Sequence, residues 1–369
     1  MISTIADFGL WALVIILFLG SVLPLSKIPH GIIRGLAFPR EQFFGLAVVS
    51  AIAAVFVLES GALHLALAVL ALVALIQLIY IVKFTSLWRR QSVDADEAQQ
   101  TDAGARLDLI AANVKLSNRD YERLIDLLRR RQPDIAIAIE VDEDWITALQ
   151  TALKADYAHW VMVPEDNGYG MCLMSRLALS EIQVRSLVVE DVPSIRTAVT
   201  LPSGDMLRLY AVHPEPPVID HDTKGRDSEI ALVGLEAKDD PLPSIVTGDL
   251  NDVAWSTTTR RFQRLSGLLD PRVGRGFYNT FHAYMPWMRW PLDHLFHDPR
   301  FRLIKMERLE KIGSDHFPML FSLALADRKK AASMPEKSDA EERGEVKDMI
   351  RQERKRDREA IGADWEDGG

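Results

Sequence analysis

Apolar residues are concentrated near the start of the chain. Three long stretches without a charged side chain run over residues 8–26, 42–58 and 60–82. A helix needs about 20 apolar residues to cross the hydrocarbon core of a bilayer, with roughly 17 to 25 tolerated, and the second stretch reaches only the lower limit. We therefore predict that residues 1–90 form a membrane anchor of three transmembrane helices.

Two other interpretations of these stretches agree less well with the sequence. A secretory signal peptide begins with a basic segment, whereas residues 1–8 carry a single charged side chain, that of Asp7. Helices of a buried core rarely come as three consecutive uncharged runs. Insertion into a bilayer is therefore the interpretation that the pattern favours.

The basic residues beside these stretches predict the orientation of the anchor. They form two groups, Lys27, Arg34 and Arg40 after the first stretch and Lys83, Arg89 and Arg90 after the third. With three spans, both groups lie on one side of the membrane, and the short loop at Glu59 lies on the other. Because basic loops tend to stay in the cytoplasm, this count places the C-terminal part of the chain there.

The rest of the chain divides into three segments by composition. Residues 91–105 are polar and acidic without apolar periodicity, which predicts a linker. Residues 327–369 are highly charged with few apolar positions, so we expect a disordered tail with at most a transient solvated helix. Residues 106–326 remain as a folded domain, of ordinary size for one core.

Within the folded domain, short apolar runs alternate with polar turns. The runs that predict strands cover residues 107–113, 135–139, 171–175, 182–189, 196–201, 207–212, 245–247, 292–296, 301–308 and 319–325. Leu124, Leu127 and Leu128 have helical spacing, which predicts a helix at Tyr121–Arg131 that ends before Pro133. Many strands with few helices predict an α+β domain of two packed sheets flanked by helices.

Composition narrows the class of protein. Apolar residues make up 48% and charged residues 26% of the 369 residues, and the mean hydropathy of +0.01 averages an apolar start with a charged end. A net charge of −9 argues against a protein that coats nucleic acid, which is normally basic. A single cysteine, Cys172, excludes an intramolecular disulfide framework and a multi-cysteine zinc site. Neither a Walker A sequence nor a G-x-G-x-x-G sequence is present.

Polar residues that can bind metal or move protons lie at the ends of the predicted strands. They are Asn113, Glu140, His213, Asp249, Asn251, Asp293, Asp315 and His316. Each alone has an ordinary structural interpretation, such as Asn113 capping a turn or Asp249 forming an Asx-turn. A whole set at equivalent places is different, because a carboxylate beside a buried strand is costly unless it is paired or binds a cation. Carboxylate and amide oxygens favour Mg²⁺ or Mn²⁺ over zinc.

The same residues lie in six short sequences that carry a family resemblance. In chain order these are AANV, IEVDE, AVHPEPP, GDLND, PLDH and GSDHFP, all between residues 107 and 325. Together they resemble the endonuclease/exonuclease/phosphatase superfamily, and the apolar start with AFPREQ is similar to a bacterial membrane-anchored branch of it. The resemblance implies a four-layer α/β sandwich, hydrolysis of a phosphoester bond and a place in the bacterial inner membrane. That branch more often looks built to display its domain outward, so an extracytoplasmic domain is the alternative to the charge count.

The resemblance also implies a role for each residue. The metal ligands are Glu140, Asp315, Asn113, Asp249 and Asn251, with Glu140 as the principal one and Mg²⁺ or Mn²⁺ as the ion. The catalytic residues are His316, Asp293, Asp249 and His213, and the substrate contacts are Asn251, His213 and Asn113. In this scheme His316 is the general base. An imidazole takes a proton from water well near neutral pH, and a carboxylate behind it fixes its tautomer. The number of metal ions, and whether Asp249 acts as a base or an acid, stay open.

The residues after GDLND bear on the substrate. Arginines and aromatic residues gather there, at Arg260, Arg261, Arg264, Arg272, Arg275, Trp255, Phe277, Tyr278, Trp287 and Trp290. Such a set can form a nucleic-acid groove, a solvated helix face beside packed loop aromatics, or a contact with lipid headgroups. Because the anchor confines the domain near a bilayer, a lipid phosphate is the first expectation, ahead of nucleic acid or a small phosphoester. A membrane-tethered nuclease and an inactive binding module remain alternatives, and the sequence identifies no protein partner.

Overall fold

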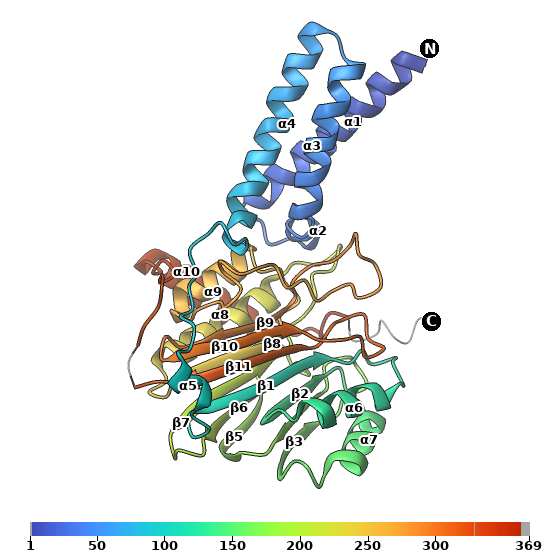
Figure 1. The fold of residues 1–369 in the computed structure, drawn as a ribbon. Helices are drawn as coiled ribbons and strands as arrows, with labels where there is room; N and C mark the ends of the chain where they lie inside the picture. The colour runs from blue at the N-terminus through green and yellow to red at the C-terminus, as the bar shows by residue number, and fades with distance from the viewer. Residues whose placement is uncertain (1, 328, 363–369) are drawn as a thin grey trace.

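A stalk of helices rises from one end of a two-sheet domain in the computed structural model, which describes residues 2–327 and 329–362 (Figure 1). The stalk contains α1 (Ile2–Val22), α3 (Arg40–Val57) and α4 (Ser60–Ile81), and its foot contains η1 (Leu23–Leu25), α2 (Gly31–Gly35) and η2 (Val82–Phe84). Three stretches are long and apolar enough to cross a membrane, with mean hydropathies of 2.4, 1.6 and 2.8: Ile5–Leu25, Arg40–Val57 and Ser60–Phe84. The three predicted helices are therefore present, and the second is the shortest at 18 residues, in agreement with the expectation that it only just reaches the required length.

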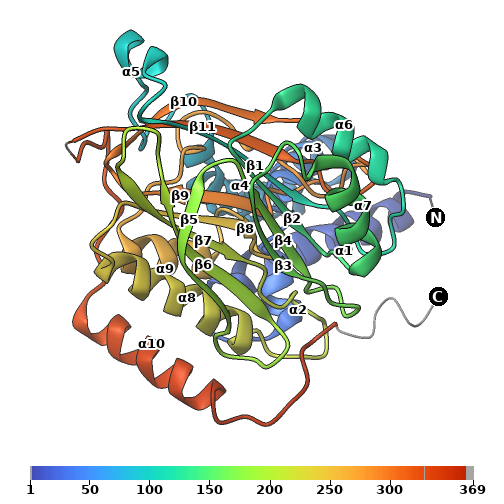
Figure 2. The same cartoon turned by 90° about the horizontal axis from the view of Figure 1, so that it is seen from below.

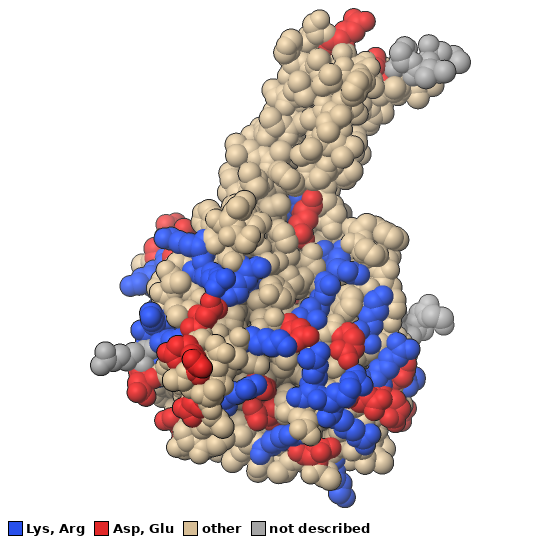
Figure 3. All heavy atoms as spheres, in the orientation of Figure 1, with Lys and Arg blue, Asp and Glu red and all other residues tan. Residues whose placement is uncertain are grey.

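The outer surface of the stalk is apolar. Phe8 and Phe56 are 74% and 84% exposed, and charged side chains are almost absent from the stalk in Figure 3. Such a surface is costly in water and suits the hydrocarbon core of a bilayer. Inside the stalk, Arg40 Nη1 donates to Gln77 Oε1 (2.8 Å), and Gln77 Nε2 donates to Ser21 Oγ (2.6 Å). This chain of hydrogen bonds removes the cost of isolated buried polar groups.

The domain is built on two mixed sheets. The first has six strands in the order β10 (Phe301–Arg308), β11 (Met319–Leu325), β1 (Arg106–Asn113), β2 (Ile135–Ile139), β4 (Met171–Ser175) and β3 (His159–Val163). The second has five strands in the order β5 (Ala178–Ser186), β6 (Pro193–Thr200), β7 (Met206–Val212), β8 (Ser244–Asp249) and β9 (Asp293–His297). Neighbouring strands are antiparallel except for β1–β2 and β7–β8, which are parallel.

Four layers result from the packing of these sheets. Apolar side chains such as Leu109 and Ile137 of the first sheet share one core with Leu209 and Ile245 of the second. On the outer faces, α6 (Tyr121–Arg131) and α7 (Glu143–Leu153) cover the first sheet, while α8 (Lys224–Asp239) and α9 (Thr257–Ser266) cover the second (Figure 2). The predicted α+β fold of two packed sheets flanked by helices is confirmed.

The elements of the domain that the sequence pattern does not predict include β3 and α8. The helical pattern of α8 is hidden because its buried residues include Arg226, Asp227 and Glu229. Arg226 is satisfied there, since its Nη2 donates to Asp227 Oδ1 (2.9 Å) and its Nη1 to Asn251 O (2.9 Å). The edge strand β5 begins at Ala178, earlier than the predicted residue 182. Most of its side chains are exposed, so its sequence has no apolar run from which the start could be predicted.

The predicted linker is attached to the domain near both of its ends, where Ala95 and Gly104 form backbone hydrogen bonds with domain residues. It contains the short helix α5 (Glu97–Thr101). The Ser92 hydroxyl lies 2.7 Å from His297 Nε2, and Ala95 N donates to Leu303 O (2.9 Å). The segment therefore fixes the domain beneath the stalk instead of acting as a loose tether.

The predicted disordered tail also requires correction. It contains α10 (Ala340–Glu353), which lies against α8 and α9 and buries Val346 and Ile350 in a cluster with Ala231 and Leu265 (Figure 2). Two apolar side chains at helical spacing provide this contact, and the high charge of the segment concealed them. Residues 328 and 363–369 of the predicted tail lie outside the described residues.

Hydrogen bonds join the stalk to the domain. Gly274 N donates to Lys83 O (2.8 Å), just below α4, and the indole Nε1 of Trp255 donates to Ala37 O (2.7 Å), between α2 and α3. Both basic groups of the anchor therefore lie at its domain end. This is the arrangement that an odd number of spans requires.

Candidate active site

The two sheets bring the predicted site residues to one edge. Asn113 ends β1, and Glu140 directly follows β2, its parallel neighbour. In the second sheet, His213 directly follows β7 and Asp249 ends β8, again a parallel neighbour. Because the carboxyl ends of parallel strands lie at the same edge, each sheet contributes a pair of polar residues. Ligand atoms of Glu140, His213 and Asp249 all lie within 4.8 Å of one another.

Glu140 is held in this cluster by hydrogen bonds. Asn113 Nδ2 donates to Glu140 Oε1 (2.5 Å) and lies 3.1 Å from Asp249 Oδ2, while Leu116 N donates to Glu140 Oε2 (3.3 Å). The backbone of Glu140 has a φ of 64°, a left-handed conformation that is costly for this residue and is typical of functional sites. Burial raises the pKa of Glu140 to about 7; Asn113 opposes the rise, and the carboxylates of Asp249 and Asp315 add to it. The carboxylates in and around the cluster therefore repel one another.

The GDLN sequence forms a tight turn that places Asp249 and Asn251. Gly248 has a φ of 142°, and a Cβ at this position would lie 1.9 Å from Val212 O, so only glycine lets β8 approach β7 this closely. Asn251 N donates to Asp249 Oδ1 (2.9 Å). Asn251 Nδ2 lies 3.2 Å from His213 Nε2. The turn therefore carries Asp249 and Asn251 to the His213 side of the site.

Asp249 links this cluster to a second one that contains Asp293 and His316. His316 Nδ1 lies 2.8 Å from Asp293 Oδ2, and His316 Nε2 lies 3.4 Å from Asp249 Oδ2. Burial alone would lower the pKa of His316, but the carboxylates of Asp293 and Asp249 outweigh it and raise the pKa to about 10. Asp293 is fixed in turn by its backbone N–H, which donates to the Thr280 hydroxyl (3.2 Å). With Nδ1 directed to Asp293, the Nε2 atom is available for proton transfer.

His213 is buried on the other side of Asp249. Burial lowers the pKa of His213 to about 4, so its imidazole is neutral at pH 7. In the described part of the chain, His213 Nδ1 has no hydrogen-bond partner, although it is fully buried. An unsatisfied buried nitrogen is costly and marks a position where a ligand group can bind. The ring of Tyr169, which is also buried, lies 5.5 Å from that of His213.

Asp315 is a predicted metal ligand that the structure does not bring into the two clusters. It is in neither group of close ligand atoms, and its Oδ2 lies 3.2 Å from Lys115 Nζ. Lys115 was missed in the sequence analysis although it lies two positions after Asn113, whose Oδ1 accepts a hydrogen bond from Lys115 N (2.9 Å). Phe281, with its ring 4.9 Å from that of His316, was missed as well. Neither residue has a local pattern that indicates a site, because its partner is distant in the sequence.

The donor set fits a hard divalent cation. Glu140 and Asp249 offer carboxylate oxygens within one cluster, and carboxylate oxygens are the ligands that Mg²⁺ and Mn²⁺ prefer. Asn113 directs its Nδ2 at both carboxylates, so its side-chain amide would have to turn before its oxygen could join them as a ligand. The raised pKa of Glu140 also favours a cation site, because a bound cation would relieve the repulsion among the buried carboxylates. The residues present are therefore able to hold a divalent metal.

The arginines after GDLND do not form a groove. Four of the five lie within salt-bridge distance of an acidic residue: Arg261 and Arg264 of Glu342, Arg272 of Asp270, and Arg275 of Asp94. Among the aromatic residues of the set, Trp255, Phe277 and Trp290 pack in one cluster with Phe84 at the foot of the stalk. These contacts account for most of the set without nucleic acid.

Comparisons with known proteins agree with this geometry. A model described as the Endonuclease/Exonuclease/phosphatase family matches residues 110–316, more than half of the chain. The solved structure of D. rerio TDP2 with a single-strand DNA product is 20% identical, has a TM-score of 0.51, and covers 59% of this chain and 99% of that chain. A mannosyl-6-phosphatase of Bacteroides thetaiotaomicron is 19% identical, with a TM-score of 0.46 and coverage of 59% and 100%. Among curated proteins, no sequence matches this chain.

The family match spans the sequence motifs whose polar residues meet at the sheet edge, and the chain is a hydrolase of phosphoester bonds. It belongs to the endonuclease/exonuclease/phosphatase family. The resemblance seen in the sequence is confirmed, while the likeness to D. rerio TDP2 supports the fold alone.

Proposed function

We propose that the protein hydrolyses a phosphoester at a membrane surface, with Mg²⁺ or Mn²⁺ at the Glu140 cluster and His316 activating the attacking water. The observation that carries this proposal is the contact of His316 Nδ1 with Asp293 Oδ2 (2.8 Å), in a site where Glu140 and Asp249 lie close by. An imidazole backed by a carboxylate and set beside a cation site is the arrangement that phosphoester hydrolysis requires.

Each residue of the site has a part in the proposed reaction. A divalent ion held by Glu140, Asn113 and Asp249, with Asp315 nearby, would offset the charge of the phosphoryl oxygens and favour the neutral form of His316. His316 accepts a proton from water at Nε2, and Asp293 fixes its tautomer and stabilises the imidazolium. Asp249 and Asn251 orient the water and the phosphate. Neutral His213 donates a hydrogen bond to a phosphoryl oxygen as negative charge develops.

A loop between the active site and the stalk favours a lipid phosphate as the substrate. The loop begins near Phe281, which contacts the His316 ring, and it reaches Trp287, whose carbonyl oxygen accepts a hydrogen bond from Gln42 Nε2 (3.1 Å). Gln42 lies in the first turn of α3, where the second span begins, and Trp287 is 69% exposed. In a bilayer crossed by α3, Trp287 lies at headgroup level, where tryptophan is enriched. The loop thus extends the active site toward the bilayer surface.

Two alternative functions would require different features of the site. A membrane-tethered nuclease needs a basic groove, and the ion pairs of four of the five arginines after GDLND count against it. An inactive binding module needs a damaged catalytic cluster, whereas the carboxylates and imidazoles of the motifs lie together. The proposed hydrolase of a lipid phosphoester therefore agrees best with the structure.

The test uses the full-length protein purified in detergent. Bis-p-nitrophenyl phosphate should be hydrolysed with added Mg²⁺, and the activity should disappear with EDTA and in His316→Ala. A substrate panel then compares phospholipids in mixed micelles, oligonucleotides, and sugar or inositol phosphates. Faster cleavage of oligonucleotides than of any lipid would show that nucleic acid, and not a lipid, is the substrate. Inactivity of the wild type with both Mg²⁺ and Mn²⁺ would favour the binding module.

A further inference from the structure

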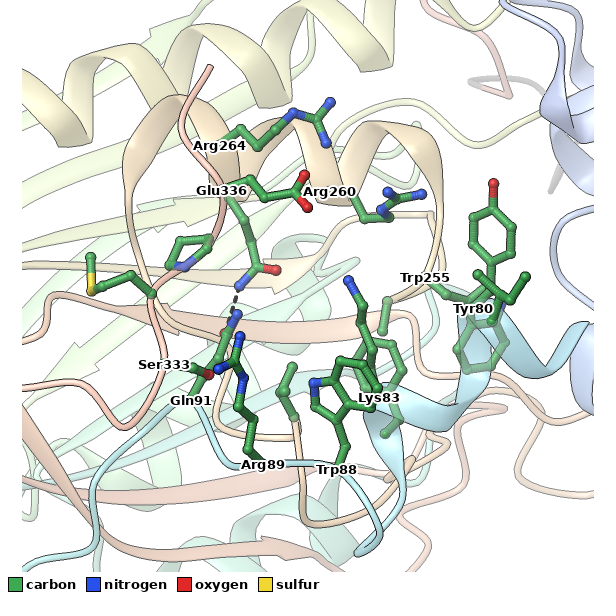
Figure 4. Close-up of a pocket in the computed structure, with 17 residues that line it drawn as sticks. Tyr80, Lys83, Trp88, Arg89, Gln91, Trp255, Arg260, Arg264, Ser333 and Glu336 are labelled. Carbon is green, nitrogen blue, oxygen red and sulfur yellow. Dashed lines mark hydrogen bonds between the residues drawn. The ribbon is translucent and has the colours of Figure 1, made fainter. Parts of the chain in front are cut away.

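A cavity of about 300 Å³ lies where the stalk meets the domain, and none of the site residues described above lines it (Figure 4). Most of its wall comes from three parts of the chain: the end of α4 with the segment that follows it, the α9 helix, and the tail segment before α10. The cavity therefore lies at the depth where α4 leaves the membrane. Its size is at the lower end of the range for small-molecule sites, roughly 300 to 1,000 Å³.

Among the charged side chains that line the cavity, basic ones predominate. The lining residues include four cations, Lys83, Arg89, Arg260 and Arg264, and one carboxylate, that of Glu336. Arg264 is neutralised by Glu342, to which its Nε and Nη2 donate (2.9 and 2.5 Å). For Lys83, Arg89 and Arg260, no acidic group lies within salt-bridge distance in the part of the chain that the structure describes. The cavity thus has a surplus of positive charge.

Two of these cations converge on one space. Lys83 extends its amine from the foot of α4 toward the α9 wall, and Arg260, on that wall, directs its guanidinium group toward Tyr80 (Figure 4). The guanidinium carbon of Arg260 lies 5.2 Å from the centre of the Tyr80 ring, and Lys83 Nζ lies 6.0 Å from that of Trp88. Aromatic faces hold cations in place without neutralising them. An anion with several oxygens, such as a phosphate, can accept hydrogen bonds from both side chains.

The lipid-facing surface of α4 leads directly into the cavity. Leu72, Leu75 and Ile79 are 45%, 53% and 57% exposed, and their spacing places them on one stripe of the helix. Lys83 lies in η2, directly after α4 and four positions after Ile79, and both residues line the cavity. An acyl chain along the stripe would therefore place its headgroup beside Lys83.

We propose that this cavity binds the phosphate of an anionic phospholipid, with the phosphate between Lys83 and Arg260 and an acyl chain along α4. The site is distinct from the catalytic cluster, and the proposal holds whichever phosphoester the enzyme cleaves. Because its wall includes the stalk, α9 and the tail segment, a bound lipid connects all three.

The test measures lipid retention by native mass spectrometry on the full-length protein in detergent. The probes are phosphatidylglycerol, phosphatidylcholine and inorganic phosphate. The wild type should retain phosphatidylglycerol in preference to phosphatidylcholine, and Lys83→Gln with Arg260→Gln should weaken this retention by about five-fold for each charge removed. Lys83→Arg, which keeps the charge, should retain the lipid, and this variant separates loss of binding from loss of fold.

A matched control separates the cavity from general surface charge. Arg90 follows Arg89 in the chain, but it pairs with Asp94 and does not line the cavity. Arg90→Gln removes one positive charge close to the foot of the stalk and should leave phosphatidylglycerol retention unchanged. An equal loss in Arg90→Gln, or no preference for phosphatidylglycerol in the wild type, would overturn the proposal. Competition by inorganic phosphate as effective as that by the lipid would assign the site to free phosphate instead.

Discussion

Glu140→Gln tests the metal assignment with almost no change in side-chain size. The amide is neutral and a weaker ligand, so hydrolysis should fall by about 100-fold or more, and the remaining activity should need more Mg²⁺. The measurement is turnover of bis-p-nitrophenyl phosphate across a Mg²⁺ titration. Glu143→Gln, three positions further on an exposed turn of α7, is the matched control and should behave as wild type. Wild-type turnover and metal dependence in Glu140→Gln would exclude Glu140 as a ligand.

The pair of Asp293 and His316 should act as one unit. Each alanine variant should lower kcat by roughly 100- to 10,000-fold, since Asp293 acts only through the imidazole that it orients. The double variant should therefore be little worse than His316→Ala alone. Single-variant and double-variant kcat values on one soluble substrate provide the check, and fully additive losses would show that the two residues work independently.

The buried carboxyl group of Glu229 should make the free energy of unfolding depend on pH. Glu229 is 1% exposed on α8, and neither carboxylate oxygen has a hydrogen-bond partner in the described part of the chain. Burial, with repulsion from Glu215, raises the pKa of Glu229 from 4.5 to about 8. Its stabilising contribution is therefore complete below pH 4.5 and is lost as the pH rises through about 8.

Glu229→Gln should remove this loss, because the amide stays neutral. Thermal unfolding between pH 5 and 8 should then show the variant gaining stability over the wild type as the pH rises, by roughly 1.4 kcal/mol for each pH unit at most. Parallel Tm curves for the two proteins across this range would show that the carboxylate of Glu229 does not titrate in it.

At the scale of elements, the docking of α10 is open to a direct test. Val346 is fully buried against α8 and α9, so Val346→Asp places a charge among apolar side chains at a cost of about 3 kcal/mol or more. The helix should be released, and trypsin should cleave the tail faster at its many basic residues, as followed by mass spectrometry. Lys347→Asp changes an exposed neighbour and should leave the cleavage rate near that of the wild type. Equal rates in all three proteins would mean that the Val346 contact does not hold the helix.

Elements with a clear local pattern could be predicted from the sequence, and those held by distant partners could not. The bounds of α6, β2, β4, β10 and β11 agree with the prediction, because each has an apolar run, recurring apolar positions or a helical stripe. The helix α8 buries charged residues whose partners come from elsewhere, such as Asn251 O for Arg226, and the charges conceal its pattern. The helix α10 depends on apolar positions of α8 and α9 that its own sequence does not show.

The same distinction applies to the site. Asn113, Glu140, Asp249 and Asp293 lie at strand ends or next to them, and His316 lies in the loop just before β11, so the strand pattern indicates where these residues are and the two sheets bring them together. The contact of Lys115 with Asp315 joins residues 200 positions apart, and nothing in either local sequence predicts it. Local patterns therefore located the cluster, but not the contacts between distant segments that complete it.

At the scale of the whole molecule, the open question is which side of the membrane holds the domain. The domain and both basic groups of the anchor lie at one end of the stalk, and the turn between α3 and α4, at Glu59, lies at the other (Figure 1). Arg34 and Arg40 are buried in the folded protein, but orientation is decided during insertion, so they still count toward the basic side. We therefore expect the domain in the cytoplasm, against the outward display that the resemblance to the anchored branch suggests.

Fusions of alkaline phosphatase and of a fluorescent protein can decide this question in a bacterial host. They belong after Gly369, because a junction at Ala326 would remove the docked helix α10. With a cytoplasmic domain, the fluorescent fusion is bright and the phosphatase fusion is inactive, since alkaline phosphatase needs an oxidising compartment to form its disulfides. Truncated fusions after Glu59, which follow only two spans, should show the opposite pattern and confirm that both reporters work. An active phosphatase after Gly369 with a dark fluorescent fusion would place the site outside the cell membrane, where its lipid substrate would have to come from the outer leaflet.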